Sequence, residues 1–67
     1  MTNILERREY RAAYAALLDA EARGATPETR RIRRVDLLGA WVRAREAGVT
    51  EAALRDIRAD VPYPEGC

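Results

Sequence analysis

The sequence contains no histidine, lysine, glutamine, serine or phenylalanine, and its single cysteine, Cys67, is the last residue. One cysteine excludes a disulfide within the chain. Without histidine or a cysteine cluster, a zinc site lacks its usual ligands. Catalysis near neutral pH usually depends on His, or on a tuned Glu, Lys or Cys, so we do not expect an enzyme. We also expect no cofactor, because there is no glycine-rich phosphate-binding loop.

Long apolar runs and an excess of one charge are absent as well. No stretch has the length and hydropathy of a signal peptide or a membrane span, so we expect a cytoplasmic protein without membrane contact. The chain has twelve arginines and eleven acidic residues, which gives a formal net charge of +1. This balance counts against a dedicated nucleic-acid binder, which usually has a clear basic excess. Arginine as the sole basic residue, with abundant alanine, is typical of GC-rich bacteria and their phages.

At 67 residues the chain is long enough for one small domain. A core of this size rarely supplies more than about 3–5 kcal/mol of stability, and such chains often need disulfides, a metal or a second subunit. Since a disulfide within the chain is excluded and a zinc site lacks its usual ligands, we expect a homodimer.

The first helix is predicted over residues 4–23. Asn3 and Glu6 have the spacing of a capping box, and Gly24 suits the left-handed residue that ends many helices. Apolar side chains at three–four spacing define one face of this helix: Tyr10, Tyr14, Leu17 and Leu18. We interpret Tyr10 and Tyr14 as core residues or, together with Leu38, as a dimer seam.

Two further helices follow. Thr26 and Pro27 suit the cap and the first position of a helix that continues to residue 47. After Gly48, Thr50 is predicted to cap a third helix over residues 51–60, which Pro62 ends. The predicted fold class is all-α: a small three-helix bundle, homodimeric, with two longer helices and one short C-terminal helix. It forms a single domain, 1–61, with a short extended tail, 62–67.

The middle helix has more apolar surface than one core requires. At about 100° per residue, one side of the helix carries Ile32, Val35, Leu38 and Val42. Leu37 and Trp41 widen the apolar arc to about 220°. A helix that faces a single core needs little more than about 100°. We therefore expect a face that meets a second subunit, another protein or both.

This surplus face combines arginine with large apolar residues at spacings of three and four: Arg30, Arg34, Leu37, Trp41 and Arg45. Trp and Arg are the residue types most enriched at interface hot spots, and Arg34 and Arg45 are placed to stack on the Trp41 indole. We predict that these five residues contact a protein partner. The alternative is that Trp41 is the core aromatic of the bundle, with arginine side chains lying over it.

Four arginines in the five residues 30–34 also suggest phosphate contacts. On a helix, however, these side chains point in different directions, and Glu28 and Asp36 flank them. A solvated helix face is the preferred interpretation.

Residues 40–57 contain small residues in one helix, a Gly-Val-Thr turn, and hydrophobic residues at two positions of the next helix: Ala44, Ala47, Gly48, Val49, Thr50, Leu54 and Ile57. This segment resembles the helix-turn-helix motif of bacterial and phage regulators. The resemblance implies that Thr50, Glu51, Ala52 and Arg55 contact base edges in the major groove. If the chain binds DNA in this way, we expect Arg31 and Arg33 of the arginine run to contact phosphates.

These observations predict a small stoichiometric regulator of phage or mobile-element type, which binds and modulates a host protein through a helical surface. The acidic third helix, with Glu51, Asp56 and Asp60, favours a protein partner because its charge opposes a phosphate backbone. The alternative is a helix-turn-helix transcriptional regulator that binds DNA.

Overall fold

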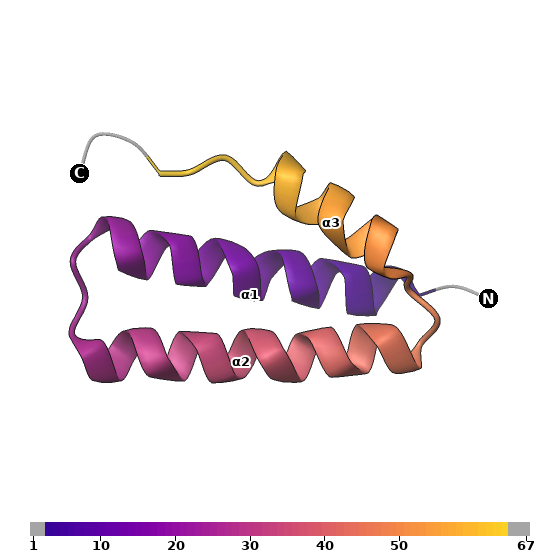
Figure 1. Cartoon of the computed structure of the whole chain (residues 1–67), viewed down its shortest axis with the longest axis horizontal. Helices are drawn as coiled ribbons and strands as arrows, with labels where there is room; N and C mark the ends of the chain where they lie inside the picture. The colour runs from indigo at the N-terminus through magenta and orange to yellow at the C-terminus, as the bar shows by residue number, and fades with distance from the viewer. Residues whose placement is uncertain (1–2, 65–67) are drawn as a thin grey trace.

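The computed structural model describes residues 3–64 as three helices, α1 (Ile4–Ala22), α2 (Pro27–Glu46) and α3 (Glu51–Asp60), with no strand in that range. Figure 1 shows α1 and α2 lying side by side and antiparallel, with the shorter α3 over the N-terminal half of α1. The predicted all-helical, three-helix architecture is confirmed. Residues 61–64 are not helical, while the rest of the predicted tail, including Cys67, lies outside the described residues.

The sequence signals at the two loops act as predicted. Gly24 and Gly48 both have positive φ, +69° and +95°. Each is followed by the backbone hydrogen bond of a Schellman motif, such as the 2.9 Å bond from the Val49 N–H to the Ala44 carbonyl. The hydroxyls of Thr26 and Thr50 then accept backbone N–H groups three residues later, at 3.2 and 3.1 Å, and so cap α2 and α3.

The start of α1 differs from the prediction. Asn3 occupies the cap position, but its side chain makes no capping hydrogen bond and its backbone is not extended. Its side-chain oxygen instead accepts from the Arg7 Nε–H at 2.8 Å. A hydrogen bond from a charged guanidinium is stronger than one from a neutral amide, so the predicted capping box with Glu6 does not form.

The core lies where α1, the C-terminal half of α2 and α3 meet. Its fully buried members are Tyr10, Ala40, Ala44, Val49 and Leu54. Two of them, Val49 and Leu54, flank the Thr50 cap at the spacing of a hydrophobic staple and fix the angle at which α3 leaves the turn. Small residues on the inner side of α2 leave room for the Tyr10 ring.

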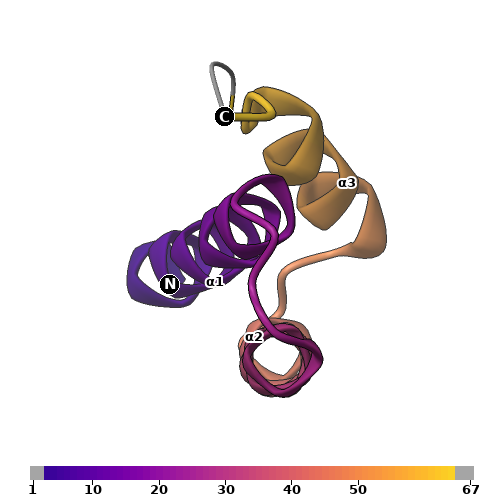
Figure 2. The same cartoon turned by 90° about the vertical axis from the view of Figure 1, so that its left-hand side faces the viewer.

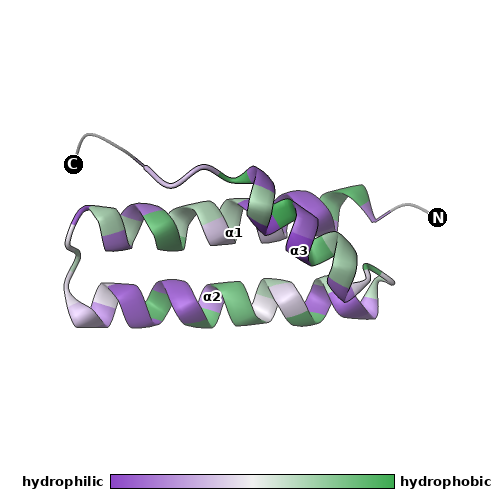
Figure 3. Cartoon of the chain, turned by 45° about the horizontal axis from the view of Figure 1, so that its top comes forward, coloured by the Kyte–Doolittle hydropathy of each residue, from purple (hydrophilic) through white to green (hydrophobic). Residues whose placement is uncertain are grey.

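The side of α2 that the sequence interpretation assigned to a partner packs on the core, and the other apolar side is exposed. Leu37 and Trp41, assigned to the surplus face, pack against the core beside Ala40 and Ala44. The opposite side stays between 39 and 61% exposed, and we call it the outer face: Ile32, Val35, Leu38 and Val42. In Figure 2, α1 and α3 both lie on one side of α2, and in Figure 3 hydrophobic residues recur along the middle of α2. Small residues allow close helix approach, so hydrophobic size alone selects the wrong side.

Two glycines are expected to respond oppositely to alanine. Gly48 has φ +95° with no atom near an added Cβ, so Gly48→Ala costs about 1 kcal/mol through backbone strain alone. Gly39 lies inside α2, where an added Cβ meets only the end of the Arg43 side chain at 3.4 Å, and Gly39→Ala stabilises by up to about 1 kcal/mol. Urea unfolding followed by circular dichroism measures both. Equal effects of the two substitutions would contradict the assigned backbone conformations.

Candidate functional site

An open groove of about 460 Å³ lies where the three helices meet. We call it the central groove. Its lining comes from α1, α2 and α3 together: Tyr10, Leu17, Arg34, Leu37, Leu38, Trp41 and Arg58. The lining is mostly apolar, and among these residues two are arginines and none is acidic. The groove therefore combines a hydrophobic floor with positive charge.

The Arg58 guanidinium is fixed by a hydrogen bond to Tyr10. Its Nη1–H donates to the Tyr10 hydroxyl oxygen at 2.5 Å, across 48 positions of sequence. Tyr10 is only 1% exposed, so this bond satisfies a hydroxyl that is otherwise shielded from water. The same hydrogen bond raises the pKa of Arg58 above its ordinary value, while burial acts in the opposite direction. The contact holds α3 on α1 and keeps a permanent positive charge beside the groove.

The indole of Trp41 is held from two directions. Its Nε1–H donates to Glu51 Oε2 at 2.9 Å, and the Arg45 guanidinium carbon lies 5.6 Å from the ring centroid. Arg45 and Glu51 also form an ion pair at 3.4 Å. Trp41 thus packs on the core with an arginine over its ring, as the alternative interpretation described, and one part of the ring still lines the groove. Arg45 stacks as expected, whereas Arg34 lies along the groove.

The structure brings together five of the predicted partner and dimer residues. Arg34, Leu37 and Trp41 from the surplus face line the central groove with Tyr10 and Leu38 from the predicted seam. The three remaining residues do not belong to its lining: Arg30, Arg45 and Tyr14. Because Tyr10 is fully buried within one chain, it is a core residue and offers no ring surface to a second copy.

Sequence reasoning missed Arg58. Its position four residues after the buried Leu54 places it on the inner face of α3, and this spacing was the available signal. The pairing with Tyr10 was not predictable, since it depends on how α3 folds back on α1.

The residues of the DNA-binding alternative do not gather on one surface. Arg31 and Arg33 point about 160° apart on α2, and Arg33 pairs with Asp36 at 3.8 Å. The Thr50 hydroxyl caps α3, and Glu51 binds Trp41 and Arg45. Arg55 is exposed on α3. Arg31 is also far from α3 along the helix axis. Fourteen positions separate it from Arg45, which lies at the end of α2 nearest α3, and they correspond to about 21 Å.

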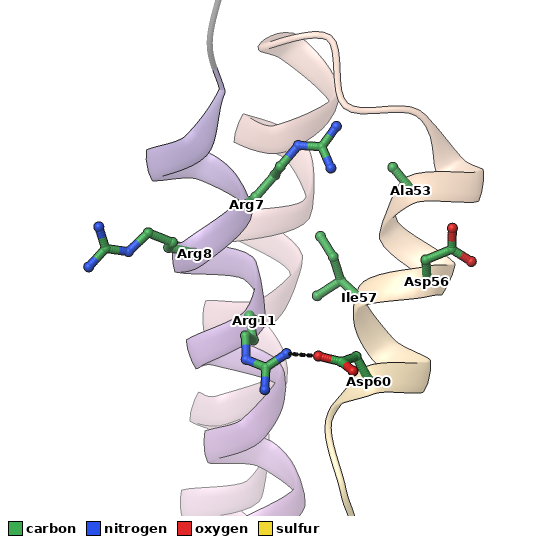
Figure 4. Close-up of a pocket in the computed structure, with 7 residues that line it drawn as sticks. All are labelled: Arg7, Arg8, Arg11, Ala53, Asp56, Ile57 and Asp60. Carbon is green, nitrogen blue, oxygen red and sulfur yellow. Dashed lines mark hydrogen bonds and ion pairs between the residues drawn. The ribbon is translucent and has the colours of Figure 1, made fainter.

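A second groove, of about 450 Å³, lies between α1 and α3. Figure 4 shows Ile57 pointing toward α1 and Arg8 pointing away from α3. Arg11 pairs with Asp60 at 2.6 Å across the groove. With three arginines and two aspartates in its lining, this groove has little preference for a ligand of one charge.

Within residues 3–64, no three His, Cys, Asp or Glu side chains are grouped so that they could hold a metal ion. None of the helices in this range combines the length and hydropathy needed to cross a membrane. In comparisons with protein families, with curated proteins and with solved structures, the chain has no significant match.

Proposed function

We propose that this chain is a small stoichiometric regulator that binds another protein through the central groove and performs no catalysis itself. One observation carries the proposal: an apolar groove, formed by all three helices, whose only charged lining residues are Arg34 and Arg58. An amphipathic helix with acidic residues beside its apolar anchors is complementary to such a surface. We therefore infer that the partner presents a segment of this kind.

The arrangement of the groove favours binding energetically. Leu37 and Trp41 are only partly buried, so a partner that covers the rest of their surface removes apolar area from water. Trp41 and Arg58 are already held by Glu51 and Tyr10, respectively. A partner does not have to order these two side chains on binding, which lowers the entropic cost of association. Tryptophan and arginine are also the residue types that most often dominate interface energies.

We propose further that the chain acts as a homodimer. The fully buried core contains five residues, two of them alanines, and a core of this size supplies little stability. The outer face meanwhile leaves four large aliphatic side chains of α2 in solvent. A second copy that covered some of this surface would add the burial that one chain lacks.

Charge reversal at Arg34 tests the binding function. Arg34 is exposed and lines the groove, so Arg34→Glu is expected to leave the fold intact and to weaken partner binding at least about tenfold. Trp41 is unsuitable for this test, because it packs on the core and its replacement changes folding and binding together. Immobilised wild-type and variant chains are incubated with lysate, with and without nuclease. Captured proteins are identified by mass spectrometry. Each is then purified, and its affinity for the wild-type and variant chains is measured by titration.

The matched control is Arg55→Glu, the same charge reversal on an exposed residue outside both grooves. The proposal expects a nuclease-resistant protein that Arg55→Glu retains and Arg34→Glu loses. Capture of only nuclease-sensitive material, lost with Arg55→Glu and kept with Arg34→Glu, would contradict it. That result would instead support the helix-turn-helix DNA-binding alternative.

A further inference from the structure

The outer face of α2 is an apolar surface of which only Leu38 lines the central groove. Ile32, Val35 and Val42 line neither the central groove nor the groove between α1 and α3, and together with Leu38 they extend over about three turns of α2. α1 and α3 both lie on one side of α2 (Figure 2), and the outer face remains exposed. Among residues 3–64 these four side chains stay 39–61% exposed, so the face has surface available to a second molecule.

We propose that the outer face pairs with the outer face of a second copy, with the two α2 helices parallel and in register. Positions 32, 35, 39 and 42 follow the three–four alternation of a two-stranded coiled coil, over two repeats. Gly39 occupies one of these positions and lets the two helices approach closely. The inference specifies the geometry of the homodimer proposed above, and it does not depend on what binds in the central groove.

Charge complementarity selects the parallel arrangement. In a parallel, in-register pair, the residue directly before position 32 or 39 lies opposite the residue five positions later in the second copy. Arg31 then lies opposite Asp36 of the second copy, and the twofold axis repeats this ion pair. Leu38 lies opposite Arg43 of the second copy, whose aliphatic stem can cover it.

The antiparallel arrangement brings like charges together. The antiparallel register that opposes all the apolar positions, with Ile32 opposite Val42 and Val35 opposite Gly39, places Arg31 opposite Arg45. It also places the two Asp36 carboxylates near each other at the centre. Shifting the helices by one repeat removes these contacts but leaves Ile32 or Val42 without an apolar partner. Only the parallel pair satisfies both the apolar and the charged positions.

Sedimentation equilibrium measures the pairing directly. With four apolar side chains per copy, the interface lies at the small end of the known range, and we expect a dissociation constant on the order of 10–100 μM. Between about 1 and about 500 μM, the weight-average mass should rise from the 7.5 kDa of one chain toward twice that value. Val35→Glu should remain monomeric throughout, and Ala12→Glu, an exposed substitution on α1, should dimerise like the wild type.

Charge exchange tests the orientation. Arg31→Glu and Asp36→Arg should each weaken dimerisation about threefold or more, and the double variant should recover wild-type affinity. In the antiparallel pair, Arg31→Glu would face Arg45 and strengthen dimerisation. Tighter association of Arg31→Glu, or no recovery in the double variant, would overturn the parallel arrangement.

The same measurements separate this inference from the proposals on which it is based. A wild-type chain that stays monomeric at every concentration would overturn the homodimer altogether. A dimer that Val35→Glu leaves intact would overturn only the assigned face. Arg34→Glu should dimerise normally, since Arg34 lies on the groove side of α2, so loss of partner binding and loss of dimerisation are expected in different variants.

Discussion

Replacing Leu54 with alanine is expected to unfold most of the chain at room temperature. Leu54 is fully buried at the centre of the core and connects α3 to α1 and α2. Truncation of a buried leucine costs about 2–5 kcal/mol, because apolar contacts are lost and a cavity remains. This loss equals most of the roughly 3–5 kcal/mol that a core of this size supplies. Far-UV circular dichroism, with and without urea, measures the folded fraction.

The control for this prediction is Leu5→Ala. Leu5 is 62% exposed on α1, so the same truncation there should change stability by no more than about 0.5 kcal/mol. If Leu54→Ala were as stable as Leu5→Ala, α3 would not pack as an integral part of the core. The position of Arg58 beside the central groove would then also be wrong.

Placing a charge at Ala40 is expected to be at least as damaging. Ala40 is 2% exposed and faces α1 from the inner side of α2. Ala40→Glu introduces a longer side chain and a carboxylate at a position that the core shields from water. Burial of an unpaired charge costs several kcal/mol and overpacking adds about 1–3 kcal/mol, so the variant should be largely unfolded without denaturant. Loss of helical circular dichroism and of a cooperative unfolding transition would report this.

The helices of this protein were predictable because their signals are local. The Thr26 and Thr50 caps and the glycines that end α1 and α2 act within a few residues of themselves, and each was correctly placed. The predicted Asn3 cap does not form because the Arg7 guanidinium donates a hydrogen bond to the Asn3 side-chain oxygen instead. Local rules give the candidate caps, and the strongest available donor decides which one forms.

The inner side of α2 was not predictable from hydrophobicity. Ile32 and Val35 are larger and more apolar than Ala40 and Ala44, yet the alanines are buried. Close packing of two helices depends on how nearly their backbones can approach, and this favours small residues at the contact. Only the three-dimensional packing shows which of two apolar sides one chain uses.

The candidate site was predicted only in part, because its residues come from more than one helix. Arg34, Leu37 and Trp41 were identified from one helix, because their spacing places them on one line. Arg58 joins them only through its long-range hydrogen bond to Tyr10. Side chains contributed by a separate helix require the tertiary fold, which the sequence pattern of α2 does not contain.

The central claim is that α2 packs on the core through the side that carries Ala40 and Ala44 and leaves its outer face exposed, since both the groove and the dimer face depend on it. The most direct test compares urea unfolding of Ala40→Glu and Val35→Glu at about 1 μM, where we expect a monomer. The structure predicts that Ala40→Glu has no cooperative transition, while Val35→Glu unfolds within about 0.5 kcal/mol of the wild type. If Val35→Glu were unfolded and Ala40→Glu remained folded, α2 would present the opposite side to the core, and both proposed surfaces would be wrong.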